Sequence, residues 1–584
     1  MTDMDHKDNN CKTIGLLVED TCTDYTKDIT HSVAHSIMAR KDLKLVMIAG
    51  KQDYSTDPGV NLHHYRQIYN SIYLINSLCH FDGLLVSFPN LNSTGMDYFG
   101  DIPRVLISSE KKGELSVSYN NEKGIREALD YLVRIKGFTR ICMLGGRDDN
   151  TDAKKRKEIV TRFMAEAGLP FSDDQYVWSD MSDNTQEAAA KLLKNNPDAQ
   201  AIFCVNDAAA SGLYDVMREN GLVPGKDIYV FGFDNAVMAV QMVPPLASIG
   251  ADGVTVGQKA LEILLDKIDG KETSSAYVPT RFFGRDSFEY ETYEITSKDI
   301  LMVDSAFIYS FFDDCFYRYG NEIVDKGDVD LRRLFYEIIS RMMSSIKNRY
   351  MDEKQYSEIR RLIDAFFDNG AMRYTDANKL VKSLSRLQGS MNETLRGSFS
   401  NSYNNRLFSY IRNKAIQSQA FEKAMEDKLS SARREMIQSF LINTAKYYGS
   451  EKDGIDNVID NIDKLGFGNS ALYLFREPVI YKGDGRDTIP ETIDLRCVYK
   501  NGSLYVIHED RRECSVSEIY SRNELSCDIM GQISFPVFYG NYLFGILVCG
   551  ISRMIMDSGE YLTELLARAI YMNIEGGFLW PENL

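Results

Sequence analysis

Histidine is missing from most of this 584-residue chain. Six of its seven histidines lie no later than His80, and the seventh is His508. The interval between them therefore supplies no histidine general base or metal ligand. His31 and His35 stand four residues apart, a spacing that can bind a metal, but no glutamate lies between them in an HExxH arrangement. We expect this pair to be surface or packing residues.

Paired cysteines and catalytic motifs are also missing. Ten cysteines are scattered from Cys11 to Cys549, and no two of them form a CxxC pair. We expect them to be reduced and mostly buried. The sequence has no GxxxxGK[ST] phosphate loop, no nucleophile–base pair and no metal-ligand cluster. We therefore expect no enzymatic activity, no cofactor and no metal.

Long apolar runs and an excess of positive charge are absent as well. No run of about 18 apolar residues indicates a membrane span, and the polar start MTDMDHKDNNCK does not resemble a secretory signal. We therefore expect a cytoplasmic protein without membrane contact. The 67 Lys and Arg residues stand against 84 Asp and Glu residues, which gives a net charge of -17. A chain of this sign repels nucleic-acid backbones, so sequence-independent DNA binding is disfavoured.

Short apolar runs alternate with helix-period stretches from Lys12 to about residue 286. Strands that are apolar throughout and separated by helices predict an α/β fold, with parallel sheets covered on both faces. Such sheets bind ligands at the carboxyl ends of their strands. Polar residues follow several of the runs and are the first candidates for a binding site: Asp20, Ser87, Asn206, Asp207 and Asp234.

The same stretch resembles a known family. The segments FDGLLVS (81–87), AIFCVNDAAASGLYDVMRENGLVPGKDIYVFGFDN (201–235) and PPLASIGAD (244–252) follow one another in the order and spacing of the LacI/GalR ligand-binding region. This resemblance covers residues 12–287 and implies a two-lobed, periplasmic-binding-protein-like domain. Lobe 1 would comprise about 12–116 and 247–279, and lobe 2 about 117–246. A small molecule would bind between the lobes.

The resemblance also implies roles for individual residues. Asp207 would accept hydrogen bonds from ligand hydroxyls, and Arg156 would be the arginine at the start of the family's ligand-binding helix. Asp234 matches the acidic end of the VxGFD strand. Asp20 and Tyr25 fall in the first strand–helix loop, where the family places polar and aromatic ligand contacts. A buried carboxylate needs such donors, and an arginine offers paired ones.

Several positions depart from the family pattern. Asn120 stands where aspartate is usual, and Ile159-Val160 replaces a glycine–aromatic step. Only residues 1–11 precede the first predicted strand, which leaves no room there for a helix-turn-helix. We therefore expect no direct DNA binding.

The second half begins with a helical region, residues 297–448. The part from 402 to 448 contains neither glycine nor proline, and it places Phe421, Met425, Leu429, Ala432 and Met436 at three- and four-residue steps. This pattern fits a dimeric coiled coil and a packed bundle helix equally well. We expect a homodimer.

Residues 449–576 return to a mixed pattern with a closing helix. ISFPVFYGNYLFGILVCG reads as a β-hairpin around Gly540-Asn541. The order of helix, antiparallel strands and helix resembles a GAF sensor domain. The whole arrangement resembles the regulatory half of sensor diguanylate cyclases, without a cyclase domain.

These observations predict a small-molecule-sensing regulatory protein. It would bind a polar metabolite, sugar-like or nucleoside-like, and transmit lobe closure through its helices. Two alternatives stay open: a LacI-family transcriptional regulator that acts without its own helix-turn-helix, and the sensor part of a diguanylate cyclase.

Overall fold

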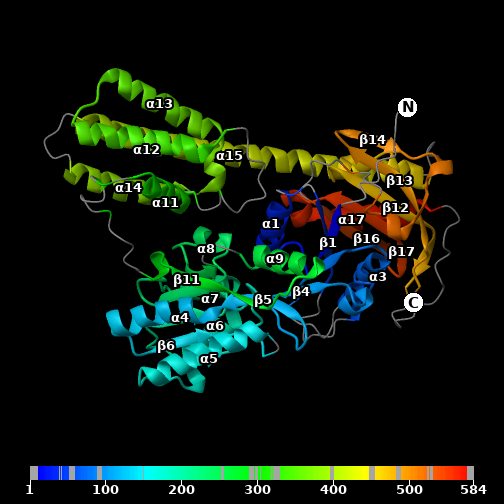
Figure 1. Cartoon of the computed structure of the whole chain (residues 1–584), viewed down its shortest axis with the longest axis horizontal. Coiled ribbons are helices and arrows are strands. Elements are labelled where there is room, and N and C mark those ends of the chain that lie inside the picture. The colour runs from blue at the N-terminus through cyan, green and yellow to red at the C-terminus, as the bar shows by residue number, and fades with distance from the viewer. Residues whose placement is uncertain are drawn as a thin grey trace. The chain divides into compact units, whose positions relative to one another are not determined.

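The computed structural model describes residues 11–38, 40, 42–51, 60–88, 95–148, 150–251, 255–288, 295, 300, 302, 304–316, 319, 329–375, 377–394, 400–445, 454–481, 488–521, 525 and 531–574 (Figure 1). The chain divides into two compact units, residues 1–289 with 435–584 and residues 290–434. Within the described ranges, no helix combines the length and apolar character that crossing a bilayer requires.

Lobe 1 is a parallel sheet in the strand order β2-β1-β3-β4-β5. Its strands are almost entirely buried, as the apolar runs predict. The strands are β1 (Lys12–Val18), β2 (Leu43–Ala49), β3 (Gly83–Ser87), β4 (Arg104–Ile107) and β5 (Leu115–Asn120). The helices of this lobe are α1 (Asp24–Met38), α2 (Val60–Tyr69), α3 (Ser71–Ser77), η2 (Gly95–Phe99) and α9 (Val256–Ile268).

Lobe 2 is a second parallel sheet, in the order β7-β6-β8-β9-β10. Its strands are β6 (Ile141–Leu144), β7 (Tyr176–Val177), β8 (Ala201–Cys204), β9 (Tyr229–Phe233) and β10 (Ala247–Ala251). Its helices are α4 (Asn121–Asp130), η3 (Tyr131–Ile135), α5 (Thr151–Glu166), η4 (Asp173–Gln175), α6 (Gln186–Asn195), α7 (Asp207–Glu219), α8 (Val237–Gln241) and η5 (Asp286–Phe288). The expected lobe boundary is wrong at β10, because this strand pairs with β9 of lobe 2.

One strand, β11 (Ala276–Phe283), belongs to both sheets. Its first half, 276–279, pairs in parallel with β5, and its second half, 280–283, pairs antiparallel with β10. The two lobes are therefore joined by a continuous backbone ladder as well as by the crossover segments.

The carboxyl-terminal part of the first unit is an antiparallel sheet in the order β13-β12-β17-β16, with β14 and β15 paired to β13. The predicted hairpin is present, with Tyr539 opposite Tyr542. The strands are β12 (Ser470–Ile480), β13 (Thr492–Lys500), β14 (Ser503–Val506), β15 (Glu513–Ser515), β16 (Gln532–Tyr539) and β17 (Tyr542–Gly550). The helices are α16 (Ile455–Ile459), η7 (Ile462–Leu465), η8 (Glu509–Arg511), η9 (Val516–Glu518) and α17 (Arg553–Asn573).

This antiparallel sheet continues the sheet of lobe 1. Strand β16 pairs in parallel with β2, with Gln532, Ile533 and Ser534 opposite Val46, Met47 and Ile48. A single hydrophobic cluster contains buried residues of both parts. Residues 454–574 therefore pack with lobe 1 in one unit, and the assignment of 449–576 to the GAF class stays a prediction.

A buried polar contact lies at the same junction. The hydroxyl of Tyr520 donates to Oδ1 of Asn76 over 2.5 Å. The amide of Asn76 in turn donates to the carbonyl of Ile72 (2.7 Å) and, at 3.4 Å, to Oγ of Ser534 on β16. The side-chain amide of Asn76 on α3 therefore has hydrogen-bond partners on both sides of the junction.

The second unit is helical, as predicted for this region. It contains α11 (Ser305–Cys315), α12 (Leu331–Asn348), α13 (Glu353–Asp368), η6 (Ala371–Tyr374), α14 (Ala377–Thr394) and the first part of α15 (Ser400–Thr444). Helix α15 contributes Leu407, Phe408 and Ala415 to the core of this unit, which fits a bundle helix. Further along α15, Phe421 and Leu429 are 63% and 60% exposed. The coiled-coil interpretation of that part stays a prediction.

We expect Tyr520→Phe to weaken the junction between β2 and β16. The substitution removes one buried hydrogen bond and leaves an oxygen of Asn76 without this donor, a loss of about 1–3 kcal/mol. Hydrogen–deuterium exchange followed by mass spectrometry should show faster exchange in 43–49 and in 532–539 together. Tyr505→Phe is the matched control, because Tyr505 is half exposed on β14. Faster exchange in only one of the two strands would contradict a shared sheet.

Candidate functional site

The lobe 1 side of the site is formed around Tyr25 on α1. Its hydroxyl is buried and forms no hydrogen bond of standard geometry with any described residue. The pKa of Tyr25 is raised, first by burial and then by the carboxylates of Asp152 and Asp234, while the nearby hydroxyls of Ser108 and Ser87 oppose the rise. Because the two carboxylates belong to lobe 2, this tyrosine faces the opposite lobe.

Ser108 follows β4 and has an unusual backbone. Its φ is 54°, in the left-handed region that residues with a Cβ rarely occupy. Its hydroxyl is buried without a hydrogen-bond partner. Strained non-glycine residues are typical of binding and active sites. The hydroxyl of Ser108 thus lies beside that of Tyr25, close enough to lower the pKa of the tyrosine.

The lobe 2 side is organised by Arg156 on α5. This residue is only 3% exposed. Its Nε donates to Oδ1 of Asn121 (3.2 Å) and its Nη1 to the carbonyl of Val205 (2.6 Å). The guanidinium carbon lies 3.5 Å from the centroid of the Phe233 ring, a cation–π contact. These contacts fix the guanidinium, and its Nη2 lies 3.6 Å from Oδ1 of Asp234.

Asp234 follows β9 and carries the strongest local strain of the site. Its φ is 102°. Burial raises the pKa of Asp234 to about 6, an effect that Arg156 opposes and the neighbouring carboxylate of Asp152 reinforces. Asp152 is itself buried and accepts a hydrogen bond from the amide of Asn121 at 3.0 Å.

Glu19 is a site residue that the sequence analysis missed. Burial and the adjacent Asp20 raise its pKa to about 8, and Arg147 of lobe 2 partly offsets this rise. Its Oε2 is buried without a hydrogen-bond partner. The signal was available, because Glu19 directly follows strand β1. The sequence analysis instead named its neighbour Asp20 as a ligand contact.

Two of the predicted ligand contacts, Asp20 and Asn206, have local partners. Asp20 accepts from the backbone N–H groups of Cys22 and Thr23 and so shapes its own loop. Asn206 caps α7 by accepting from Ala209 N at 2.9 Å. Their direct contact with a ligand stays a prediction.

Asp207 is likewise engaged within lobe 2. It is 1% exposed, and its two oxygens accept from Ala236 N (2.8 Å) and from Oγ of Ser248 (2.6 Å). A Cβ at Gly232 would lie 2.2 Å from Asp207 Oδ1. The carboxylate therefore holds the segment that carries Asp234 in place, and a ligand contact of its own also stays a prediction.

The two lobes are joined directly beside the site. Lys155 of α5 forms an ion pair with Glu110 of lobe 1 at 2.6 Å. The hydroxyl of Tyr277 on β11 donates to the same carboxylate at 3.0 Å. Both charged side chains are about one-third exposed, so water weakens this pair.

The arrangement suits a polar organic molecule. Tyr25 and Ser108 offer hydroxyls, Glu19 and Asp234 offer acceptor oxygens, and the fixed guanidinium of Arg156 adds positive charge. Among the residues that the structure describes, no three His, Cys, Asp or Glu side chains lie together so that they could hold a metal. His31 is buried in α1, with its ring centroid 6.0 Å from that of His35.

Comparison with known families identifies the class of this fold. Residues 129–288 match the family of periplasmic binding protein-like domains. The two-lobed α/β architecture agrees with this match.

The curated relatives are transcriptional regulators. The chain is 32% identical over 197 residues to the "HTH-type transcriptional repressor PurR" of Vibrio parahaemolyticus. The aligned region covers 33% of this chain and 59% of the relative. It is 26% identical over 274 residues to the repressor of the same name from Aliivibrio fischeri strain MJ11, 46% of this chain and 77% of that protein. The chain thus spans less than two-thirds of the length of the Vibrio repressor.

Solved structures with similarity include "transcriptional regulator CelR-cellobiose complex" (22% identity, TM-score 0.41, 48% of this chain and 85% of that one). The Lac repressor dimer bound to operator and an anti-inducer is 18% identical with a TM-score of 0.39, over 48% of this chain and 95% of that one.

The relatives do not bear out the expectation that this chain binds no DNA directly. The Vibrio and Aliivibrio proteins are named as helix-turn-helix transcriptional repressors.

We expect Asp234→Asn to stabilise the first unit more at pH 7.5 than at pH 4.5. The pKa of Asp234 lies near 6 when folded and near 3.8 when unfolded, so the folded state binds the proton more tightly. The cost of the buried charge is therefore absent below pH 3.8, grows between 3.8 and 6, and is complete above 6, where it reaches about 2–3 kcal/mol. Thermal unfolding of variant and wild type at both pH values measures this difference. Asp183→Asn, at an exposed position, is the control. Equal effects of Asp234→Asn at the two pH values would contradict the raised pKa.

Proposed function

We propose that this chain is a cytoplasmic, homodimeric regulatory protein that senses a small polar metabolite between the two lobes of its LacI/GalR-type domain. The metabolite is a sugar or a nucleoside-like compound, carrying several hydroxyl groups. The relatives are named as regulators, and one related structure holds cellobiose, which supports a regulatory and non-enzymatic role.

The observation that carries the proposal is the set of unpartnered polar atoms between the lobes. The hydroxyls of Tyr25 and Ser108 are buried next to each other, and neither forms a hydrogen bond of full geometry with a described residue. Oε2 of Glu19 is buried without a hydrogen-bond partner among the described residues. A buried polar group without a partner costs about 1–3 kcal/mol. In this proposal a ligand with several hydroxyls satisfies these groups and also reaches Asp234, whose charge acts on Tyr25, and Arg156 beside it.

The binding signal has a direct route to the carboxyl-terminal sheet. Lys27, on the same helix as Tyr25, pairs with Asp557 of α17 at 2.6 Å. Lys51, just after β2, pairs with Glu560 of α17 at 2.5 Å, and Tyr65 donates to Glu560 at 3.0 Å. We propose that closure of the lobes shifts α1 and, with it, α17. In this proposal residues 454–574 act as a GAF-like receiver, as in the regulatory part of a diguanylate cyclase.

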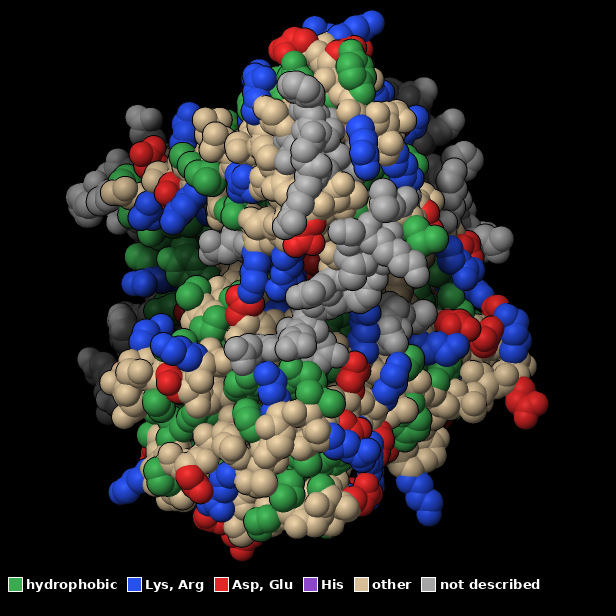
Figure 2. Space-filling view, turned by 90° about the vertical axis from the view of Figure 1, so that its left-hand side faces the viewer, with side chains coloured by type: hydrophobic (Ala, Val, Ile, Leu, Met, Phe, Trp, Pro, Cys, Tyr) green, Lys and Arg blue, Asp and Glu red, His purple; other side chains and the backbone are tan. Residues whose placement is uncertain are grey.

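A second candidate function is transcriptional regulation through DNA, which the names of the Vibrio and Aliivibrio relatives favour. On the face drawn in Figure 2, lysine and arginine side chains are interspersed with acidic ones. If the described residues on that face contact DNA, the contact would therefore depend on individual lysine and arginine side chains.

We expect Tyr25→Phe and Asp234→Asn each to weaken ligand binding at least about tenfold, since each removes a hydrogen bond to a buried group. The measurement is calorimetry of the full chain against a panel of monosaccharides, disaccharides, nucleosides and nucleobases. Tyr98→Phe and Asp183→Asn are matched controls, because both positions are exposed. A panel compound whose affinity both site variants leave intact would refute the interlobe site.

An electrophoretic shift assay with a random-sequence DNA duplex library, at low salt, separates the second function from the first. A regulator that binds DNA directly gives shifted complexes whose affinity falls steeply with salt. If DNA contact is the function, selected duplexes bind more tightly than the library. Absence of any shift rules out direct DNA reading by this chain.

A further inference from the structure

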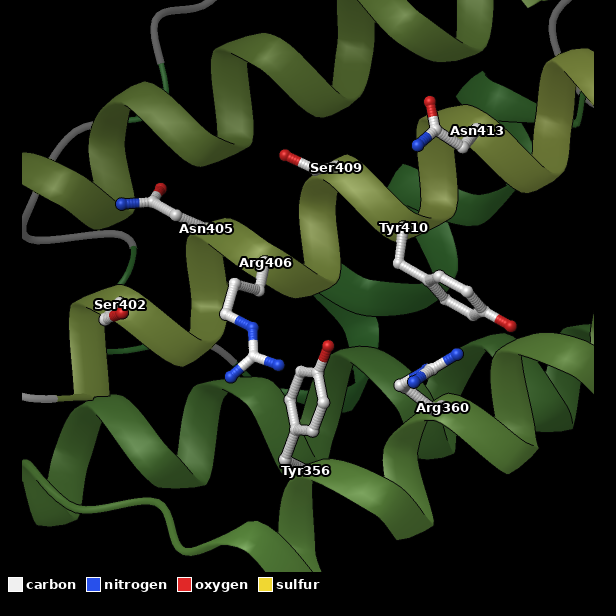
Figure 3. Close-up of a pocket in the computed structure, with 8 residues that line it drawn as sticks. All are labelled: Tyr356, Arg360, Ser402, Asn405, Arg406, Ser409, Tyr410 and Asn413. Carbon is white, nitrogen blue, oxygen red and sulfur yellow. The ribbon is translucent and has the colours of Figure 1, made fainter.

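The helical unit contains an open groove that the interlobe site does not use (Figure 3). Its volume is about 540 Å³. Tyr356 and Arg360, one turn apart on α13, form one wall. The opposite wall is a face of α15 that carries Ser402, Asn405, Arg406, Ser409, Tyr410 and Asn413. All of these side chains are polar or aromatic, and two of them carry a positive charge.

The two arginines are held in place by tyrosine rings. The guanidinium carbon of Arg406 lies 4.5 Å from the centroid of the Tyr356 ring, and that of Arg360 lies 4.2 Å from the Tyr410 ring. Arg360 is also 5.9 Å from the Tyr356 centroid, so both guanidinium groups flank one ring. Figure 3 shows these four side chains pointing toward one another across the groove. Such stacking fixes a guanidinium without neutralising it.

Neither arginine forms an ion pair with a described carboxylate, although the charge of Asp364 acts on Arg360 from nearby. Elsewhere in the same unit, Arg332 pairs with Asp313 at 2.7 Å and Arg373 with Glu422 at 3.2 Å. Nε of Arg360 is buried without a hydrogen-bond partner.

The carboxylate nearest to this wall is already engaged. Asp364 accepts from the Tyr410 hydroxyl at 2.5 Å and pairs with Lys414 at 2.8 Å. In a chain with a net charge of -17, Arg360 and Arg406 line one groove from two helices, and neither forms a direct ion pair with a described carboxylate. The groove therefore presents positive charge together with hydroxyl and amide donors, which is the complement of a phosphate group.

We propose that this groove is a second ligand site, which binds a small molecule carrying one or more phosphate groups. Arg360 and Arg406 bind the phosphate oxygens, and Ser409 on α15 donates a further hydrogen bond. Phosphate binding joins α13 to α15, so the occupied site stiffens the helical unit. The proposal does not depend on the interlobe site, because every residue that lines the groove belongs to residues 290–434.

Pyrophosphate is the probe that tests this site. Calorimetry of the full chain at low salt should show binding, and Arg360→Gln and Arg406→Gln should each weaken it at least about tenfold, the loss expected for one charge-assisted hydrogen bond. Ser409→Asp should weaken it as well, because it adds a negative charge at an exposed position without disturbing the stacked rings. Circular dichroism of each variant checks that the helices are intact.

Arg361→Gln is the matched control, since Arg361 is the exposed neighbour of Arg360 and does not line the groove. It makes the same change in net charge, and we expect it to leave pyrophosphate affinity unchanged. Tyr25→Phe should also leave it unchanged, which separates this site from the interlobe one. Failure of the wild type to bind pyrophosphate up to about 1 mM would overturn the proposal. A loss with Arg361→Gln equal to that with Arg360→Gln would overturn it too.

Discussion

The backbone pairing of β16 with β2 is the contact on which the arrangement of the first unit depends. An edge strand of a parallel sheet presents a row of unpaired N–H and C=O groups, which proteins cover or protect. In lobe 1 this edge is β2, and β16 covers it through the pairs that begin at Gln532 and Val46. Since a strand can pair only in a fixed register, the ladder also sets where the following hairpin and α17 lie. The contact of α17 with α1 is a consequence of that ladder.

Buried polar groups are satisfied at the sheet junction but not between the lobes. At the junction, Tyr520 and Asn76 satisfy each other's hydrogen bonds, as buried polar groups in folded proteins normally do. Between the lobes, the hydroxyls of Tyr25 and Ser108 are near only each other and Ser87, without a hydrogen bond of full geometry, and Oε2 of Glu19 has no hydrogen-bond partner among the described residues. The backbone of Ser108 is strained at the same point. Strain and unsatisfied groups oppose folding, so their concentration at the carboxyl ends of the strands is best explained by a requirement of binding.

Local pattern was sufficient to predict the elements of this protein but not their partners. The buried strands, the α/β alternation and the hairpin at Gly540 all follow from apolar runs and turn residues. The lobe membership of β10 and the pairing of β16 with β2 depend on contacts between distant segments, which local periodicity does not encode. The largely apolar run QISFPVFY (532–539) was the available hint of a central strand, and the structure buries all of it except the last position.

In the candidate site, too, the local sequence predicted the candidate residues but not the roles that tertiary contacts give them. Arg156 lies next to Asp234, and the charge of Asp234 acts on Tyr25, while the contact of all three with a ligand stays a prediction. Asn206 and Asp207 also follow a strand, but the first position of a helix has its own need for an acceptor, and Asn206 serves it. A polar residue at the end of a strand can therefore be a cap, a loop anchor or a ligand contact. The choice among these roles depends on which partners the tertiary fold supplies.

Helix α17 contacts lobe 1 near its start and the end of α15 near its own end. Asp557 and Glu560 near its start contact lobe 1, and the amide of Asn573 at its end donates to the carbonyl of Thr444 at 2.9 Å. The span from Asp557 to Asn573 is roughly 24 Å at the rise of an α-helix. The ion pairs at the start are partly exposed and contribute little, at most about 1 kcal/mol each. Under the proposed function, coupling would therefore come mainly from the packing of α17 on β16, which shares a backbone ladder with β2. A shift of lobe 1 would then reach Thr444, at the end of α15, through the length of α17.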